Sequence, residues 1–314
     1  MRSVPDLPMV FTTEDLRRRG VTQEQAEYRV RRKVWRRMQK GVYCTSTSWD
    51  RATAEGQHLL AGLAMCRAAE GEELVLSHVT AAVAHELPVS NKALDILTAT
   101  SPPTRRRGAG DDRHIYFATV SEIDRSSHLG VPVTTVARTV ADCLRHLPRG
   151  DAVAVADAAL HQRLTTLDGI RDVLHRQERW PFAGVARLTL PLVDGKRESW
   201  LESKSAVVMD LHGIPRPVPQ RRIFDRQRRF VARPDFVWVE HGVVGEADGR
   251  VKHAARAADV IQAEKDRQAR LEALGLVVVR WDERHLYGPN PILIKRLWAA
   301  FERADGQRFR GIAA

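Results

Sequence analysis

The sequence has little cysteine and no long apolar run. Its three cysteines, Cys44, Cys66 and Cys143, lie far apart among 314 residues. Such a small, odd and dispersed set argues against a disulfide framework and against paired zinc ligands. No stretch approaches the ~20 consecutive apolar residues that a membrane span needs, and residues 1–11 lack the apolar core of a signal peptide. We therefore expect a cytoplasmic protein with no membrane partner.

Acidic residues are fewer than basic ones. The chain has 50 Lys and Arg against 39 Asp and Glu, which gives a formal net charge of +11. This excess favours polyanionic partners, because cationic side chains neutralise phosphates and release counterions. The alternative is that many arginines only cover solvated helix faces. The distribution of charge along the chain has to decide between them.

The excess charge is concentrated at the start of the chain. Residues 1–40 contain eleven Lys and Arg against five Asp and Glu, a net of +6 and thus more than half of the total of +11. This concentration favours DNA as a partner of the N-terminal region.

Residues 1–48 carry the signals of a winged helix-turn-helix. Thr12 followed by two acids predicts a short helix that ends at Gly20, and Thr22 with Gln25 has the spacing of a capping box that opens a second helix. Alternating apolar residues then predict a β-hairpin over residues 34–43. The order helix, turn, basic helix and hairpin is typical of this module.

In that module the second helix enters the major groove and the hairpin reaches flanking phosphates. We therefore expect one amide and six cationic side chains to contact DNA: Gln25, Arg29, Arg31, Arg32, Arg36, Arg37 and Lys40. A winged helix can also serve protein contact alone, and that alternative stays open.

Residues 49–190 are rich in alanine and predict an α-rich middle domain. Helices are expected over 51–69, 76–85, 135–146 and 151–162, with one strand over 96–100 before a basic loop at 101–112. Ser77, His78 and His85 fall near helix ends, where a nucleophile and a base can be imagined. No third partner is identifiable, so we expect structural roles for them.

Residues 197–305 change pattern after turn-forming residues at 190–196. They predict a helix over 198–212, strands over 220–224, 230–232, 235–239 and 243–249, a helix over 257–274, a strand over 276–281 and a helix over 291–303. The strand–helix–strand step implies a crossover and therefore a mixed sheet. The predicted fold class is α+β, with domains at 1–48, 49–190 and 197–305.

Two carboxylates mark one edge of that sheet. Asp235 opens one predicted strand and Glu246 closes the next, eleven positions later. A short hairpin would bring them together, and carboxylate oxygens are the ligands that Mg²⁺ prefers.

The two ends of the chain resemble two known families. Residues 198–303 resemble the very-short-patch-repair-like, restriction-endonuclease-type domain of unknown function, with Leu-Glu-Ser at 201–203, Pro-Asp-Phe at 234–236, Glu-Ala-Asp-Gly at 246–249 and Gly-Leu-Val-Val-Val-Arg at 275–280. The front resembles the AbiEi-type antitoxin domain of type IV toxin–antitoxin systems, with Val-Trp-Arg-Arg-Met-Gln-Lys-Gly-Val-Tyr at 34–43, Leu-Ser-His-Val-Thr-Ala-Ala at 76–82 and Val-Thr-Thr-Val-Ala-Arg-Thr-Val-Ala-Asp at 133–142.

The nuclease resemblance implies Mg²⁺ ligation by Asp235 and Glu246, with Glu202 orienting water or completing the ligand shell. Restriction-type sites usually place Lys two residues after the second acid, where it stabilises the attacking hydroxide. This chain has Asp248 there, as a third ligand or as part of a turn.

The missing cation would have to come from Lys252 or Lys265, and His253 stands close to where related nucleases often have histidine. Two functions follow from these resemblances. One is a Mg²⁺-dependent DNA endonuclease. The other is an antitoxin or transcriptional regulator that binds DNA and a cognate toxin protein, with an inactive nuclease fold.

Overall fold

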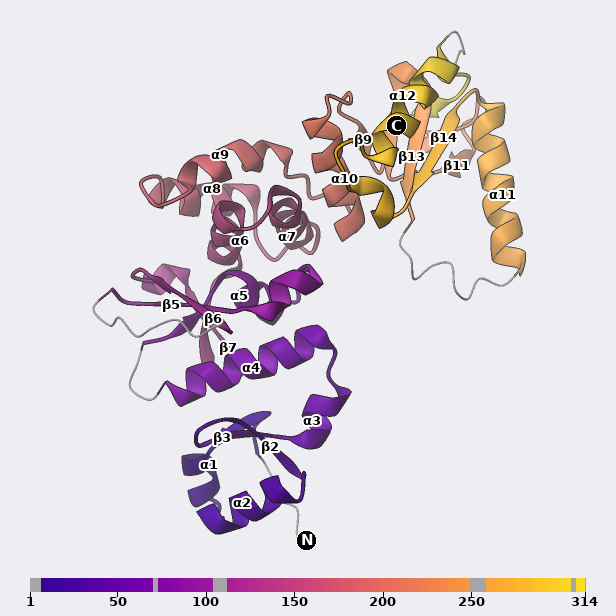
Figure 1. Ribbon diagram of the computed structural model, residues 1–314. Helices are drawn as coiled ribbons and strands as arrows, with labels where there is room; N and C mark the ends of the chain where they lie inside the picture. Colours follow the sequence, from indigo (N-terminus) through magenta and orange to yellow (C-terminus); the bar gives the residue numbers. More distant parts are fainter. Residues whose placement is uncertain (1–6, 70–72, 104–111, 249–257, 306–308, 314) are drawn as a thin grey trace. The chain divides into compact units, whose positions relative to one another are not determined.

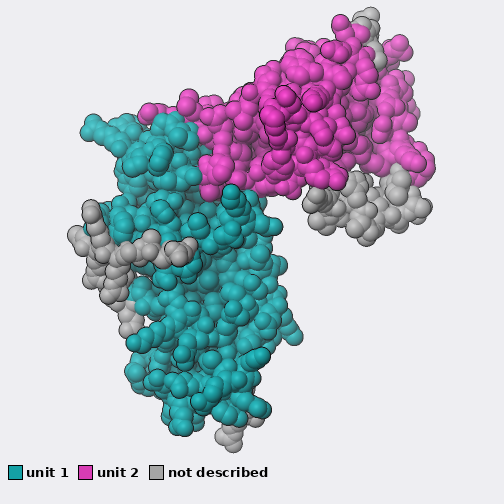
Figure 2. Space-filling view, viewed as in Figure 1, with its two compact units in different colours: residues 1–146, 164–186 teal, residues 147–163, 187–314 magenta. Residues whose placement is uncertain are grey.

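The computed structural model describes residues 7–69, 73–103, 112–248, 258–305 and 309–313 (Figure 1). These residues form two compact units, coloured separately in Figure 2. Unit 1 comprises residues 1–146 and 164–186, and unit 2 comprises residues 147–163 and 187–314. Helices and mixed sheets occur together, which confirms the α+β class.

Unit 1 begins with the predicted winged module. Its elements are β1 (Val10–Thr12), α1 (Thr13–Arg17), α2 (Gln23–Arg31), β2 (Trp35–Gln39) and β3 (Val42–Thr45). The strands form an antiparallel sheet in the order β1-β3-β2, so the hairpin is confirmed and β1 extends it. Thr12 and Thr22 each close a capping box, as the spacing predicts.

An aromatic core holds this module together. Phe11, Trp35 and Tyr43 are each at most 5% exposed, and Phe11 packs edge-on against Trp35 with ring centroids 4.9 Å apart. Leu16 of α1 and Ala26 of α2 complete the cluster. Buried aromatic rings of this kind supply much of the stability of a small module.

The middle of the chain holds more strands than expected. A five-stranded mixed sheet has the order β6-β5-β4-β8-β7. Its strands are β4 (Val75–Leu76), β5 (Leu97–Ser101), β6 (Arg113–Phe117), β7 (Arg125–His128) and β8 (Val131–Thr134). The expectation of a single strand here is wrong. β4 has only two residues, and the edge strands β6 and β7 carry too many polar residues to show an apolar alternation.

The helices of this region agree better with the sequence pattern. They are α3 (Ser46–Arg51), α4 (Ala54–Ala68), α5 (His78–Ala84), α6 (Val136–His146), α7 (Arg149–His161), α8 (Leu167–Arg176) and α9 (Ala183–Thr189). The four expected helices correspond to α4, α5, α6 and α7. In unit 1, α4 and α5 pack with the sheet and α6 packs with α5 and α8.

Helix α7 belongs to unit 2, although the predicted boundary at residue 190 separates it from the last domain. It packs on α10 (Trp200–Leu211). Asp157 of α7 accepts hydrogen bonds from Arg197 Nη1 at 2.7 Å, Ser203 Oγ at 2.7 Å and the Asp194 backbone N–H at 2.6 Å. Residues 190–196, expected as a linker, are therefore fastened to α7 by a buried charge that local sequence patterns do not reveal.

Unit 2 contains the predicted mixed sheet, in the order β14-β13-β12-β9. Its strands are β9 (Val218–Pro219), β12 (Phe236–Trp238), β13 (Val243–Ala247) and β14 (Val277–Trp281). β13 and β14 are parallel and the other pairs antiparallel. A second, smaller sheet has the order β11-β10-β15, from β10 (Ile223–Phe224), β11 (Phe230–Ala232) and β15 (Ile312–Ala313).

Helices lie on both faces of the larger sheet (Figure 1). On one face, α10 and α12 (Ile292–Ala304) bury Phe236, Trp238 and Trp281. On the other, α11 (Ala258–Ala273) and the smaller sheet cover Val237 and Val244. This helix and strand order confirms the elements predicted for residues 197–305.

None of the helices described is long and apolar enough to cross a membrane. Cys44, Cys66 and Cys143 are free thiols, so the described part of the chain has no disulfide. This agrees with the absence of a disulfide framework expected from their spacing.

Replacing Asp157 by alanine should destabilise unit 2 by about 3–5 kcal/mol, because Arg197 would remain buried without its counter-charge. Urea unfolding measures the change. Asp168→Ala is the matched control, since Asp168 pairs with Arg171 on the surface, and it should cost less than about 1 kcal/mol. Equal effects of the two substitutions would contradict the role given to the Asp157 cluster.

Candidate functional site

The first candidate site is the basic surface of α2 and the β2–β3 hairpin. Arg31, Arg32, Arg36, Arg37 and Lys40 are all exposed. Among the ion pairs of the described residues, none involves any of these five side chains. Their charges are therefore available to an external anion.

Three arginines of this surface are held by aromatic rings. The guanidinium carbon of Arg29 lies 4.8 Å from the Trp35 ring centroid, and that of Arg36 lies 4.3 Å from the Trp49 centroid. Arg37 lies 5.9 Å from Tyr43 in the same way. Stacking restrains each side chain without neutralising its charge, which lowers the entropy lost on binding a phosphate.

The remaining predicted contact, Gln25, has a structural task. Its side-chain oxygen accepts the Thr22 backbone N–H at 3.1 Å and so closes the capping box of α2. Its side chain is exposed, and its amide group remains able to donate. Arg17 and Arg18 of α1 differ from the hairpin arginines because both pair with Glu14.

The second candidate site is the carboxylate edge of the unit 2 sheet. Asp235 precedes β12 and accepts the Ala247 backbone N–H at 2.8 Å. The side-chain amide of Gln220 donates to Asp235 Oδ1 at 3.2 Å and to Glu202 Oε2 at 3.0 Å. The structure therefore brings Glu202 and Asp235 together through the side-chain amide of Gln220. Gln220 was not among the residues predicted for this site.

Glu246 lies in β13 but is held by two arginines. Arg267 Nη1 of α11 lies 2.6 Å from its Oε1, and Arg280 Nη2 of β14 lies 2.8 Å from its Oε2. Parallel pairing places Glu246 and Arg280 at the same register position. Burial raises the pKa of the Glu246 carboxyl group, and the two arginines oppose that effect.

The same arginines bind two further acids. Arg267 Nη2 lies 2.5 Å from Glu264 Oε1, and Arg280 also pairs with Glu264 and, at 3.6 Å, with Asp248. Partial burial of Glu264 is outweighed by hydrogen bonds from the arginines, which lower its pKa to about 2. Asp248 therefore belongs to an ion-pair network in this structure.

This donor set does not fit Mg²⁺ as arranged. Both carboxylate oxygens of Glu246 face guanidinium groups, and the described residues contain no cluster of three or more His, Cys, Asp or Glu side chains that could hold a metal ion. Lys265 is exposed on α11, while Lys252 and His253 lie outside the described residues. Magnesium ligation thus stays a prediction from the resemblance.

The sequence contained a signal for Arg267, because Glu264 and Arg267 are three residues apart on one helix. Arg280 and Gln220 gave no such signal. Their acid partners are 15 to 34 positions away along the chain, and only the folded structure brings them together.

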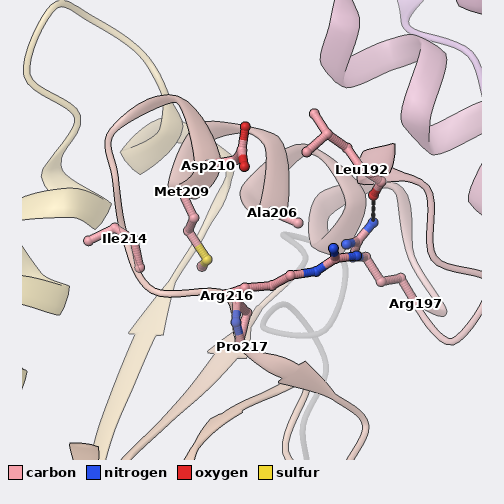
Figure 3. A pocket seen from close by; sticks show the side chains of 8 residues that line it. All are labelled: Leu192, Arg197, Ala206, Met209, Asp210, Ile214, Arg216 and Pro217. Carbon is pink, nitrogen blue, oxygen red and sulfur yellow. Dashed lines mark hydrogen bonds between the residues drawn. The ribbon is translucent and has the colours of Figure 1, made fainter. Parts of the chain in front are cut away.

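A small pocket lies against α10 (Figure 3). Arg197, Met209, Ile214 and Arg216 line it, and Arg197 Nη1 donates to the Leu192 carbonyl at 2.9 Å. Its volume of about 40 Å³ leaves room for one or two water molecules. It contains none of the predicted site residues.

The serine and histidines considered from the sequence are buried in unit 1. Ser77 is 0% and His78 2% exposed. The Nε2 of His85 lies 2.7 Å from the Thr134 carbonyl oxygen. The expected structural roles fit these positions.

The comparisons with known proteins leave the family open. No protein-family model matches the chain. Two uncharacterized proteins of Mycobacterium tuberculosis, one from strain CDC 1551 / Oshkosh and one from strain H37Rv, are each 32% identical over 146 residues, or 46% of this chain. The chain matches about half the length, 53%, of each of these relatives.

Protonation of His78 should make unit 1 less stable in acid. Burial lowers the pKa of His78 to about 3 in the folded state, against about 6.5 in an unfolded chain. Between pH 7 and pH 5 the unfolded chain binds a proton at His78, whereas the folded chain does not. This residue should therefore lower the free energy of unfolding by about 2 kcal/mol over that range.

His78→Asn tests this expectation, since asparagine tolerates the residue's positive φ of 50°. Urea unfolding at both pH values should show a smaller loss in the variant than in the wild type. The same loss in both proteins would show that His78 does not control the acid response.

Proposed function

We propose that this protein is a cytoplasmic DNA-binding protein that contacts the duplex through α2 and the β2–β3 hairpin. This proposal rests on one observation. The cationic side chains from Arg31 to Lys40 are exposed and have no acidic partner among the described residues. Some surface arginines elsewhere, such as Arg17 and Arg171, have carboxylates beside them. Unneutralised charge on one surface is the electrostatic footprint of phosphate binding.

The parts of the surface would have different tasks. Arg29, Arg31 and Arg32 come from the last turn of α2 and the residue that follows it, and the helix would enter the major groove. Arg36, Arg37 and Lys40 come from the hairpin, which would contact flanking phosphates. The stacking of Arg36 on Trp49 would fix the direction of that contact.

For the C-terminal domain, we propose a nuclease-like fold that serves protein contact rather than cleavage. The support comes from Glu246, whose carboxylate is paired with Arg267 and Arg280, and from Asp248, which stands where restriction-type sites place Lys. The protein would then be a regulator of the antitoxin type, and its protein partner a cognate toxin.

The second candidate is a Mg²⁺-dependent endonuclease, a hydrolase of phosphodiester bonds. The observation that favours it is the convergence of Glu202 and Asp235 on Gln220 at the start of β12. In that function Asp235 and Glu246 would hold the metal, which requires Glu246 to exchange its arginine partners for the ion.

Arg31→Ala and Arg32→Ala should each weaken binding to a random-sequence duplex. Loss of a cationic side chain that neutralises a phosphate at the rim of the major groove reduces the slope of log affinity against log salt by about 1. Fluorescence anisotropy at several salt concentrations gives both quantities. Arg187→Ala, an exposed arginine outside the winged module, should change neither. An unchanged slope in both winged-module variants would overturn the helix assignment.

Incubation with supercoiled plasmid and Mg²⁺ or Mn²⁺ separates the two C-terminal functions. We expect no nicking by wild-type protein that binds duplex DNA in the same buffer. Metal-dependent nicking that EDTA stops, and that Asp235→Ala and Glu246→Ala both lose, would establish the endonuclease instead. Nicking that persists in the two variants would indicate a contaminating nuclease.

A further inference from the structure

Unit 1 contains a pocket that neither DNA binding nor the carboxylate edge uses. Its volume is about 390 Å³, within the range of small-molecule sites. It lies between β5, β6, α5 and α6 and the segment 180–182. Cationic and aromatic side chains line most of it: Arg138, Arg145, His146, Tyr116, Trp180 and Phe182.

One wall carries buried positive charge. Arg138 and Arg145 are 2% and 5% exposed, and both pair with Asp142 beneath them, at 2.9 and 2.6 Å. The Trp180 ring covers both guanidinium groups, at 4.9 and 5.2 Å from its centroid. Asp124 adds a second carboxylate, but it also pairs with Arg176 at 2.5 Å.

The arginines of this wall, and not their acid partners, line the pocket. Arg138 and Arg145 are among its lining residues, whereas Asp124 and Asp142 are not. In a partly buried site a cationic group at the surface of the cavity acts strongly on a bound anion. The pocket therefore favours a ligand with negative charge.

The opposite wall is built from stacked rings. His78 lies parallel to Tyr116, with centroids 3.6 Å apart and an angle of 11°. His146 meets Tyr116 edge-on at 4.8 Å and Phe182 at 5.4 Å. Phe182 is 60% exposed, so one aromatic face is open to an incoming ring. Such rings bind planar heteroaromatic groups by stacking.

A chain of polar contacts fixes the rings. Thr100 Oγ1 donates to Ser77 Oγ at 2.8 Å, and Ser77 Oγ lies 2.9 Å from His78 Nδ1. His78 Nε2 and the Asp142 carbonyl oxygen lie 3.3 and 3.1 Å from Nδ1 of His146. Both contacts involve Nδ1 of His146. No residue that the structure describes hydrogen-bonds to its Nε2, which is therefore available to a ligand in the pocket.

The backbone of His78 has an unfavourable conformation. Its φ of 50° lies in the left-handed region, at the first residue of α5, although it is a bulky buried side chain. Such strain is unfavourable and persists where the surroundings impose it, often at ligand sites. The strained histidine here positions the aromatic wall.

We propose that this pocket binds a mononucleotide, with the base stacked against Phe182 and the His146 and Tyr116 rings and the phosphate directed toward the arginine wall. His114 and His146 line the open side. His114 supplies a hydrogen bond to the phosphate, and His146, whose ring donates through Nδ1 to the Asp142 carbonyl, accepts a hydrogen bond from the base at Nε2. The site is separate from the proposed DNA-binding surface, whose residues do not line it.

Isothermal titration calorimetry of the full chain tests the proposal with AMP, GMP, CMP and UMP, each beside its nucleoside and inorganic phosphate. We expect one or more nucleotides to bind at least tenfold more tightly than the matching nucleoside and than phosphate. Phe182→Ala should weaken nucleotide binding at least tenfold. His114→Ala should weaken the nucleotide more than the nucleoside.

Two controls keep the result specific. Ile123→Ala removes a 71% exposed apolar side chain of the same unit outside the pocket and should leave the affinity unchanged. Thermal unfolding of every variant verifies that it is folded, and the Arg31→Ala, Arg32→Ala double variant should still bind the nucleotide.

Three results would overturn the proposal. The first is the absence of any nucleotide that binds more tightly than phosphate. The second is an unchanged affinity in folded Phe182→Ala. The third is loss of binding in the Arg31→Ala, Arg32→Ala double variant, which would assign the nucleotide to the winged module.

Discussion

Pairing of buried carboxylates with arginine organises both units of this protein. Asp142 in unit 1 holds Arg138 and Arg145, and Asp157 in unit 2 holds Arg197. A charge taken out of water is strongly unfavourable unless it is paired and hydrogen-bonded. Asp157 therefore ties Arg197 and Ser203 to α7, and Asp142 fixes two arginines of its own helix, α6. These buried, paired arginines differ from exposed ones such as Arg31 and Arg32, which form no ion pair with the described residues.

This difference shows that the arginines of the chain have two separate roles. The net charge of +11 alone does not distinguish arginines that stabilise the interior from arginines that can bind an anion. In the described structure the acid partners of Arg267 and Arg280 are Glu246 and Glu264, whereas Arg31 and Arg32 have none. The proposed DNA-binding surface keeps its charge because no acid among the described residues forms an ion pair with Arg31, Arg32, Arg36, Arg37 or Lys40.

The pairing of carboxylates with arginines also determines which functions the carboxylate edge can support. A restriction-type site needs acids that are free to hold a metal and a cation that assists water. Here the cations are arginines, and they face Glu246 directly. Paired in this way, the acids connect α11 to the sheet, and this is the observation on which the proposed scaffold role rests.

Much of the fold could be predicted because its signals are local. Capping boxes at Thr12 and Thr22 join residues three apart, and the strands β12, β13 and β14 are runs of apolar residues bounded by turn formers. The Glu202, Asp235 and Glu246 carboxylates were predicted from strand ends and from family resemblance. The sheet of unit 1 was missed because short, polar strands have no periodic pattern.

The sequence by itself determined the α+β class, the helices and hairpin of residues 12–45, the concentration of positive charge near the N-terminus and the order of elements in residues 198–303. Only the tertiary structure decided that α7 joins unit 2, that arginines bind Glu246, and that His78, His146 and two arginines meet at one pocket. The physical reason is distance along the chain. Capping, turns and amphipathic periods act over a few residues, whereas burial and charge pairing join residues that lie tens of positions apart.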